Sequence, residues 1–185
     1  MQVSALVRKR VGRYEICGVI SAGGTASVHF ARQTGPLGFE RIVAIKSVHP
    51  GLAVESTFRP MLEHEARVLS RIRHPNVIAP IDVVLSDAEL FLVLEYVPGE
   101  TLARLWRAST EAKREIPIEI AVAVVAGVLR GLHAAHEARS PQGETLGLVH
   151  RDVSPQNVIV GSDGVPRVFD FGIAKLVDRT QTTEE

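Results

Sequence analysis

The stretch "HRDVSPQNVIV", residues 150–160, decides how the rest of this sequence is interpreted. It starts as a polar, loop-like segment after an apolar helix pattern and ends in a short β-type run. Asp152 is followed five positions later by Asn157, and Asp170 comes thirteen residues after that, in "DFG". Two carboxylates and an amide on neighbouring loops suit magnesium and phosphate chemistry, because oxygen ligands hold a hard cation while one carboxylate stays free to take a proton.

Each of these three residues also has a purely structural interpretation. Asp152 could be a turn residue, Asn157 a cap, and Asp170 the residue before a glycine turn. A second pair of charges favours the functional interpretation. Lys46 ends the apolar run "VAIK", and Glu65 lies nineteen residues later in an amphipathic helix pattern. A lysine that emerges from a buried strand needs a counter-charge, and a helix packed on that sheet can supply it.

The hydrophobic periods divide the chain into two parts. The first part has three β-type runs in residues 14–48, an amphipathic helix pattern in residues 56–73, and two more strands in residues 77–97. "PGE" at 98–100 breaks the sheet. The second part has helical patterns at 102–109 and 118–138, followed by short strands at 158–160 and 166–171. The pattern predicts an α+β fold with two lobes: a five-stranded antiparallel lobe with one helix, and an incomplete, mainly helical second lobe. We assign residues 1–13 to an N-terminal extension, 14–97 to the first lobe, and 98–185 to the hinge and second lobe.

Composition excludes several classes of protein. The 45% hydrophobic content is enough for a core, and equal numbers of basic and acidic residues, 21 each, indicate neither nucleic-acid nor membrane binding. The single cysteine, Cys17, favours a reducing, cytoplasmic compartment, and its apolar neighbours predict burial. In the apolar stretch 118–138, Glu119 and Arg130 leave only ten uncharged residues between them. A spanning helix needs ~20, so we interpret this stretch as a buried core helix and not a membrane span.

In this order, VAIK, HRD with an asparagine five positions after its aspartate, and DFG match the signature set of protein kinases. The segment "RHPNVI" at 73–78 resembles the family's turn after the first helix, and "LVLEYVPGETL" at 92–102 resembles its hinge. From about Tyr14 to its C-terminus the sequence therefore resembles a eukaryotic-like serine/threonine protein kinase of the bacterial type. This resemblance implies the two-lobed kinase fold, ATP and Mg²⁺ as cofactors, and a protein substrate with serine or threonine acceptors.

The resemblance also implies roles for individual residues. Lys46, paired with Glu65, would hold the α- and β-phosphates of ATP. Asp152 would orient the substrate hydroxyl and accept its proton. Asn157 and Asp170 would hold the magnesium ions.

The same resemblance implies a nucleotide site in the first lobe and at the hinge. The backbone of Glu95 and Val97 would meet adenine, with Leu94 as gatekeeper. The remaining nucleotide-binding positions are those above and below the ring, Val28, Ala44 and Ile159, and the glycine-rich loop, Ile20, Ser21, Ala22, Gly23, Gly24, Thr25, Ala26, Ser27 and Val28. Simple core packing is the alternative interpretation of the apolar positions.

The sequence departs from the family pattern in two places. Where the family has G-x-G-x-x-G, this loop has Ser21, Gly23 and Ala26, so positive φ angles would be less favourable at the outer positions and we expect a stiffer lid over ATP. Many serine/threonine kinases also have a lysine two residues after the catalytic aspartate, and here that position is Ser154. Loss of a charge-assisted contact to the transferring phosphoryl would lower the rate.

Only thirteen residues follow "DFG", so we interpret the chain as a kinase domain truncated within its activation loop. Thr180, Thr182 and Thr183 resemble activation-loop phosphoacceptors, although a frayed polar tail fits them equally well. Two other functions stay open: a non-catalytic nucleotide-binding remnant that acts as an interaction module, and a small-molecule phosphotransferase, which shares the H-x-D-x-x-x-x-N loop.

The helix pattern at 118–138 is apolar on more than one face. One stripe contains Ala121, Val124, Val128, Leu132 and Ala135, and Ile120, Val125 and Leu129 widen it. A helix of this kind needs cover on several sides, so we expect a partner for its apolar surface and reduced activity of this chain alone.

Overall fold

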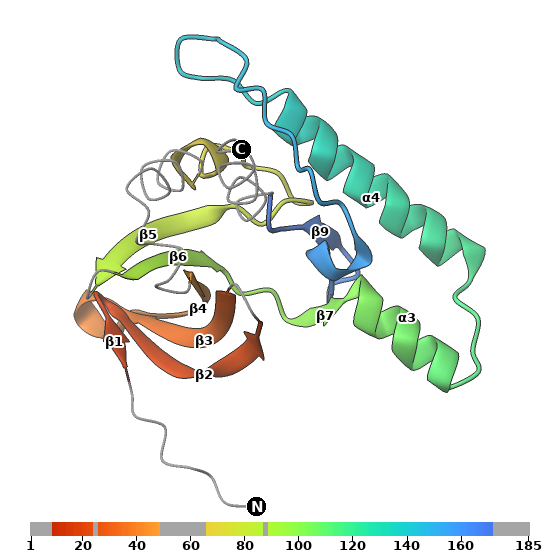
Figure 1. The fold of residues 1–185 in the computed structure, drawn as a ribbon, viewed down its shortest axis with the longest axis horizontal. Coiled ribbons are helices and arrows are strands. Elements are labelled where there is room, and N and C mark those ends of the chain that lie inside the picture. Colours follow the sequence, from red (N-terminus) through yellow and green to blue (C-terminus); the bar gives the residue numbers. More distant parts are fainter. Residues whose placement is uncertain (1–8, 24–25, 49–65, 87–88, 172–185) are drawn as a thin grey trace, which may run out of the picture. The chain divides into compact units, whose positions relative to one another are not determined.

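The computed structural model describes residues 9–23, 26–48, 66–86 and 89–171. It separates into two compact units, the first made of residues 1–70 and 80–96 and the second of residues 71–79 and 97–185 (Figure 1). The predicted α+β fold is confirmed, with strands dominating the first unit and the two long helices in the second.

The first unit is a six-stranded antiparallel sheet. Its strands are β1 (Arg10–Val11), β2 (Tyr14–Ala22), β3 (Ala26–Thr34), β4 (Glu40–Val48), β5 (Pro80–Ser86) and β6 (Glu89–Glu95), in the order β1-β2-β3-β4-β6-β5, with the short 3-10 helix η1 (Pro36–Gly38) between β3 and β4. The sequence predicted five strands and missed β1, since two residues have no detectable period. Val11 of β1 is nevertheless fully buried, so part of the predicted N-terminal extension belongs to the sheet.

One face of this sheet carries a large core cluster of the first unit, and Leu90 and Leu92 of β6 are buried on the other face. The core residues are Val11, Tyr14, Ile16, Ala31, Val43, Ile45, Phe91 and Val93, with Val84 packed against them. The hydroxyl of Tyr14 donates to Asp82 (2.7 Å) and so ties β2 to β5, with Arg13 donating to the same carboxylate oxygen (2.8 Å). Burial favours the neutral form of Asp82, but these hydrogen bonds outweigh it and the pKa of Asp82 is lowered.

Cys17 is exposed, so the prediction of its burial was wrong. Along β2, Tyr14 and Ile16 are buried, and the strand's period of two turns the side chain of Cys17 to the opposite, open face. The apolar neighbours of a cysteine therefore indicate burial only when the strand phase is also known.

The helix predicted over 56–73 lies mostly outside the described residues. Its described part is helical at 66–69 and ends at Ser70, whose N–H donates to the carbonyl of Ala66 (2.9 Å). The helix thus stops three residues before the predicted end at Arg73.

The second unit contains a small sheet and two helices. Its elements are β7 (Gly99–Thr101), α3 (Leu102–Glu111), α4 (Ile118–His136), the 3-10 helix η2 (Pro155–Asn157), β8 (Val158–Gly161) and β9 (Pro166–Val168), with strand order β7-β8-β9. The side chain of Thr101 caps α3 by accepting from the N–H of Arg104 (3.3 Å). Both predicted helices are present, with ends that differ by two residues.

Residues 71–79 belong to the second unit. The sequence had predicted instead that the first lobe runs without interruption from residue 14 to residue 97. Residues 71–79 join the second unit because of a parallel bridge between Val77 and Val168. The N–H of Val168 donates to Asn76, and the N–H of Ile78 donates to Val168, both at 2.9 Å. This segment comes between helix and strand patterns, and sequence periods do not reveal such pairing.

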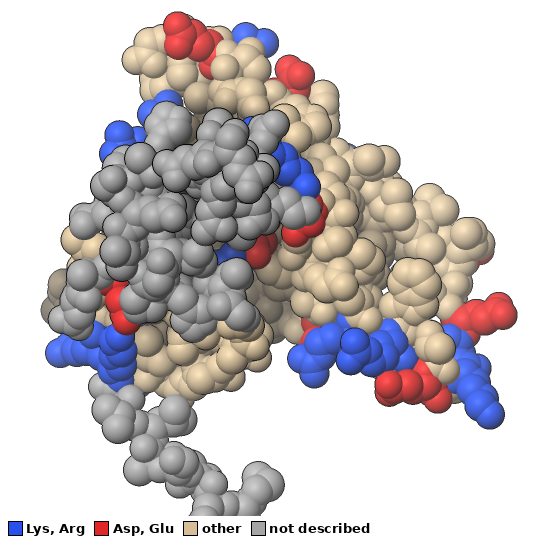
Figure 2. Space-filling model, viewed as in Figure 1, with Lys and Arg blue, Asp and Glu red and all other residues tan. Residues whose placement is uncertain are grey.

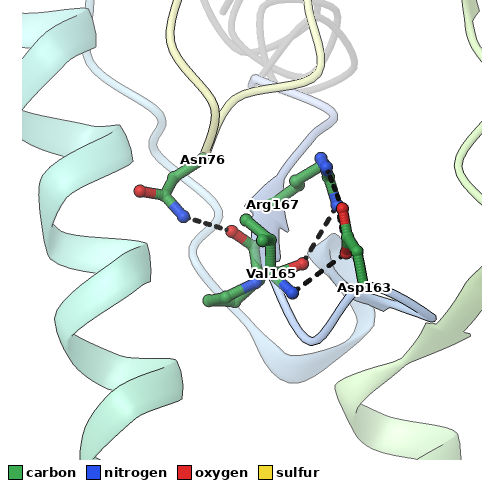
Figure 3. Close-up of polar contacts among 5 residues, drawn as sticks. Asn76, Asp163, Val165 and Arg167 are labelled. Carbon is green, nitrogen blue, oxygen red and sulfur yellow. Dashed lines mark hydrogen bonds and ion pairs between the residues drawn. The ribbon is translucent and has the colours of Figure 1, made fainter.

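Asn76 is buried where α4 meets β9 (Figure 3). Its side-chain amide donates to the carbonyl of Pro166 (2.7 Å). Gly127 and Gly131 face this region one turn apart, and a Cβ on Gly131 would lie 2.5 Å from the backbone oxygen of Asn76. Because neither glycine has a side chain, α4 can approach the backbone of the 74–78 segment closely.

The turn between β8 and β9 is held by a second set of contacts (Figure 3). Arg167 donates to both carboxylate oxygens of Asp163 (2.6 and 3.0 Å), and the N–H of Val165 donates to Asp163 (3.0 Å). The hydrogen bonds from Arg167, followed by that from Val165, lower the pKa of Asp163 to about 2. The predicted "GSDG" turn is therefore closed by its own aspartate.

The prediction that α4 is a buried core helix was wrong for most of its surface. Its buried residues are Val124, Gly127, Gly131 and Ala135, so two glycines form the centre of the packed face. Large apolar side chains on other faces are half-exposed or more: Ile118, Ile120, Val122, Val125 and Leu129. In Figure 2 the surface over α4 carries few charges, while basic and acidic residues gather around the far end of α3.

By length and composition alone, α4 could cross a membrane, and 28% of its most apolar window is buried. A packed helix of a globular domain passes the same test. The contacts of α4 with β9 show that one of its faces packs within the second unit.

Replacing Gly131 with alanine tests the close approach of α4. Alanine favours helix by ~1 kcal/mol over glycine, but its Cβ would overlap the backbone of Asn76, so we expect a net loss of about 1–2 kcal/mol in the free energy of unfolding. Urea unfolding measures this loss. Gly18→Ala is the control, because a Cβ at Gly18 meets no atom within 4 Å. Equal stability of Gly131→Ala and the parent would contradict the packing argument.

His29 on β3 should make stability depend on pH. Its Nδ1 atom is buried without a hydrogen-bond partner in the described part of the chain, and its Nε2 lies 3.3 Å from the hydroxyl of Ser47. Burial, with a smaller contribution from the charge of Lys9, lowers the pKa of His29 below its usual 6.5. The unfolded chain therefore takes up a proton on His29 at a higher pH than the folded chain does. The free energy of unfolding should fall as the pH drops below ~6.5, because protonation of His29 then favours the unfolded chain.

Chemical unfolding between about pH 7 and pH 5 measures this effect. His29→Gln should flatten the pH dependence of stability, because the group with the lowered pKa is then absent. A pH profile of His29→Gln identical to that of the parent would show that His29 does not contribute.

Candidate active site

His150 connects the two polar loops singled out by the sequence. It is 1% exposed, and its Nδ1 accepts the backbone N–H of Asp152 (3.3 Å). The ring proton therefore resides on Nε2, which donates to the carbonyl of Phe169 (2.9 Å). The imidazole also packs against the ring of Phe171, with centroids 4.5 Å apart. One buried side chain thus holds the loop of Asp152 and the segment that carries Asp170.

Asp152 and Asn157, predicted as a pair, are in direct contact. The Asn157 amide donates through Nδ2 to the carbonyl of Asp152 (2.9 Å) and to its carboxylate (3.1 Å). The backbone N–H of Asn157 donates to Ser154 (2.9 Å) in η2, and its carbonyl accepts from Phe169 (3.1 Å). Since Nδ2 is directed to Asp152, the Oδ1 of Asn157 is the side-chain atom available to a cation.

Two residues next to this pair have left-handed backbone conformations. Arg151 has φ 61° and Asp170 has φ 62°, an unfavourable region for residues with a Cβ. Conformations of this kind persist where surrounding contacts fix them, and they are common at active sites. Here two hydrogen bonds of His150, one from the N–H of Asp152 and one to the carbonyl of Phe169, hold the backbone beside Arg151 and Asp170. Phe171, directly after Asp170, is 2% exposed and anchors the segment.

In the first unit, three predicted nucleotide-binding residues share one face of the sheet. Lys46 on β4 pairs across the strands with Val28 of β3. Ala44 lies two residues before Lys46 on the same strand, so the side chains of all three point to the same side. Lys46 is half-buried and is opposite Leu92 of β6.

The glycine-rich loop departs from the expectation of positive φ angles. Ser21 pairs with Val28 and continues β2, and neither Ser21 nor Ala26 has a positive φ. The N–H of Gly23 donates to the carbonyl of Ala26 (3.0 Å) and begins the turn. The outer positions are thus ordinary strand residues, where serine and alanine are not strained.

The other predicted site residues have the following places. Ile20 and Ala22 lie on β2, Ser27 on β3, Leu94 and Glu95 at the end of β6, Val97 just after it, and Ile159 on β8. Gly24, Thr25, Glu65, Thr180, Thr182 and Thr183 lie outside the described residues. The partner of Lys46 is therefore still a prediction.

Sequence reasoning gave no role to two of the residues that organise the second unit. His150 was read only as part of a motif, and Asn76 only as part of a turn that resembles one in kinases. A signal existed for both, because each is a polar residue next to apolar segments, and a polar side chain buried there must find hydrogen-bond partners.

Comparison with known proteins agrees with this geometry. A family model described as "Protein kinase domain" matches residues 14–185. The chain belongs to the protein kinase family. Among curated relatives, it is 33% identical to the tyrosine-protein kinase MasK of Myxococcus xanthus, over 93% of this chain and 27% of MasK. It is also 33% identical to the serine/threonine-protein kinase PksC of Streptomyces coelicolor, over 86% of this chain and 28% of PksC.

Solved structures lead to the same fold. The crystal structure of the PknI kinase domain from Mycobacterium tuberculosis matches with a TM-score of 0.69 and 25% identity, over 90% of this chain and 62% of that domain. A point mutant of the same domain matches with a TM-score of 0.70 and 26% identity, over 94% of this chain and 64% of that domain. This kinase-family chain thus spans about a quarter of the two curated relatives and less than two thirds of the PknI domain.

Substitution of His150 tests its role in holding the two loops. His150→Ala removes the packing against Phe171 and both hydrogen bonds, so the free energy of unfolding should fall by about 2–4 kcal/mol. His150→Phe keeps most of the ring volume but loses the hydrogen bonds, and should lose about 1–2 kcal/mol. Urea unfolding gives these values, and amide exchange at Asp152 should accelerate in both variants. Parent-like exchange in His150→Phe would show that packing alone fixes the loop.

Proposed function

We propose that this chain is a serine/threonine protein kinase domain that transfers the γ-phosphoryl group of Mg·ATP to protein hydroxyls. The observation that carries this proposal is the contact between Asp152 and Asn157, braced by His150 against Phe169 and Phe171. In phosphoryl transfer, proteins contribute mainly positioning and charge compensation. A rigid loop that presents a carboxylate beside an amide supports both.

Each residue has a proposed role. Asp152 orients the acceptor hydroxyl and takes its proton, and the amide of Asn157 fixes the direction of that carboxylate. Lys46, with Glu65 as its proposed partner, binds the α- and β-phosphates. The backbone of Glu95 and Val97 binds adenine, and the apolar residues Val28, Ala44 and Ile159 pack against the ring.

The residues present fit a magnesium site. The proposed ligands are the carboxylate of Asp170 and Oδ1 of Asn157, and oxygen atoms are what this hard cation prefers. Among the described residues no group of three His, Cys, Asp or Glu side chains could hold a metal ion by itself. When bound, magnesium would neutralise phosphate charge.

The choice of acceptor hydroxyl also belongs to the proposal. PksC is named a serine/threonine kinase and MasK a tyrosine kinase, at the same identity to this chain. The bacterial-type motifs favour serine and threonine. We further propose a cytoplasmic location, supported by the presence of one cysteine in the sequence.

Mutations separate ATP binding from phosphoryl transfer. Asp170→Ala should weaken Mg·ATP binding in calorimetry, because it removes a proposed metal ligand. Asp152→Asn should bind Mg·ATP normally but transfer radiolabelled phosphate to casein about 10²–10⁴-fold more slowly, since the proton acceptor is lost. Phosphoamino-acid analysis of the product should show phosphoserine or phosphothreonine. Equal transfer by Asp152→Asn and the parent would contradict the proposed role of Asp152.

A specific observation favours a second candidate, a nucleotide-binding interaction module. Five large apolar side chains of α4 are about half-exposed or more, and we propose that they are covered by a partner or by the part of a kinase domain that this chain does not span. Turnover of this chain alone should then fall below the ~1–100 s⁻¹ typical of kinases. In the assay above, ATP binding with no transfer above the protein-free background would identify the module.

A further inference from the structure

A short hairpin follows α4, and the proposed kinase reaction does not use it (Figure 1). Its two arms, residues 138–140 and 144–146, are joined by their own backbone. The N–H of Leu146 donates to Ala138 (2.9 Å), and the N–H of Ser140 donates to Glu144 (2.8 Å). Residues 141–145 are all exposed. The hairpin therefore presents its tip to solvent.

The turn at the tip converges on the side chain of Ser140. The N–H of Gly143 donates to the carbonyl of Ser140 (2.9 Å), and Gly143 has φ 87°, which glycine adopts without strain. Pro141 fixes the backbone between them. The Oγ atom of Ser140 accepts the N–H of Gln142 (3.2 Å) and that of Glu144 (3.3 Å). Two N–H groups that point to one oxygen favour negative charge there.

A positive side chain lies against the same turn. Arg139 directly precedes Ser140, and its guanidinium donates to the carbonyl of Gly143 (3.1 Å). The opposing charge is that of Glu144, whose side chain is exposed, so water and salt screen it. The turn therefore suits an anionic group on Ser140.

Other hydroxyl groups differ from that of Ser140 in the direction of their hydrogen bonds. Those of Ser70, Ser109 and Thr110 donate to backbone carbonyls, and a phosphate, which carries few protons at pH 7, would lose these bonds. Ser140 accepts, so phosphate oxygens can take over both N–H groups and strengthen the bonds by charge. Thr101 also accepts an N–H, but the pairing of β7 with β8 holds its backbone in a sheet.

We propose that Ser140 is a phosphorylation site, modified by a second copy of this chain; the inference rests on the proposed kinase function. The Ser140 oxygen forms a bond to the γ-phosphorus of ATP, while the bond from that phosphorus to the β,γ-bridging oxygen breaks and ADP leaves. The hydroxyl proton passes to the Asp152 carboxylate of the second copy. The hairpin projects beyond the end of α4, where the site of another copy can approach it from solvent (Figure 1).

The modification should order the turn. A phosphate adds a charge of about −1.5 to −2 at pH 7, next to two N–H groups and Arg139. Amide exchange at Gln142 and Glu144 should therefore slow about tenfold in the phosphorylated chain.

The test mixes the parent chain and Mg·ATP with an isotopically heavy Asp152→Asn chain, which can accept phosphate but should transfer it poorly. Trypsin cleaves after Arg139 and Arg151, so the fragment of residues 140–151 contains two acceptors, Ser140 and Thr145. Mass spectrometry should find one phosphate on the heavy fragment, at Ser140. Ser140→Ala in the heavy chain should abolish it, and the matched control Thr145→Val should not.

Transfer to casein, measured in the same reaction, separates two kinds of failure. Labelled casein with an unmodified heavy fragment would overturn the phosphorylation site and leave the proposed kinase function standing. No label on either would count against both. Phosphate on the light fragment alone would contradict transfer between copies. Unchanged amide exchange in the phosphorylated chain would contradict the role of the two N–H groups.

Discussion

The second unit depends on the close approach of α4 to the backbone of Asn76. Without side chains at Gly127 and Gly131, the helix lies against a carbonyl that itself accepts the N–H of Val168. From this point a series of backbone hydrogen bonds leads to the candidate active site, because the next residue, Phe169, donates to Asn157 and accepts from His150. The segment that carries the predicted magnesium ligand Asn157 is therefore connected to a helix contact well outside residues 150–157.

His150 shows how a fold can hold residues in unfavourable conformations. Arg151 and Asp170 both have positive φ angles, each with a cost of order 1–2 kcal/mol if nothing stabilises it. The buried imidazole bonds to the backbone on either side of them and packs on Phe171. Because those contacts are lost together when the loops separate, the strain and its stabilisation form one cooperative unit.

The sequence predicted what periodicity and motif spacing encode. Most of the strands and both helices of the second unit follow from alternation and from 3.6-residue periods, and one motif singled out Asp152 and Asn157, which the structure brings into contact. The prediction failed where the deciding feature has no hydrophobic signal. The predicted stripe of α4 contains two of its buried residues, Val124 and Ala135, but the other two, Gly127 and Gly131, carry no hydrophobic signal, and the burial of Cys17 depended on strand phase. The pairing of Val77 with Val168 is non-local, and no local pattern reports it.

Ser154 links the loop geometry to the proposed chemistry. It has extended backbone angles (φ −148°, ψ 160°) before η2, and its hydroxyl makes no capping hydrogen bond. Within residues 150–157 the single basic side chain that is always charged is Arg151, which is exposed. A hydroxyl can donate one hydrogen bond to a phosphoryl oxygen but cannot neutralise its charge. Under the proposed function, charge compensation therefore falls on Lys46 and on the cation, so the geometry of the magnesium ligands should matter more here than in kinases whose loop carries a lysine.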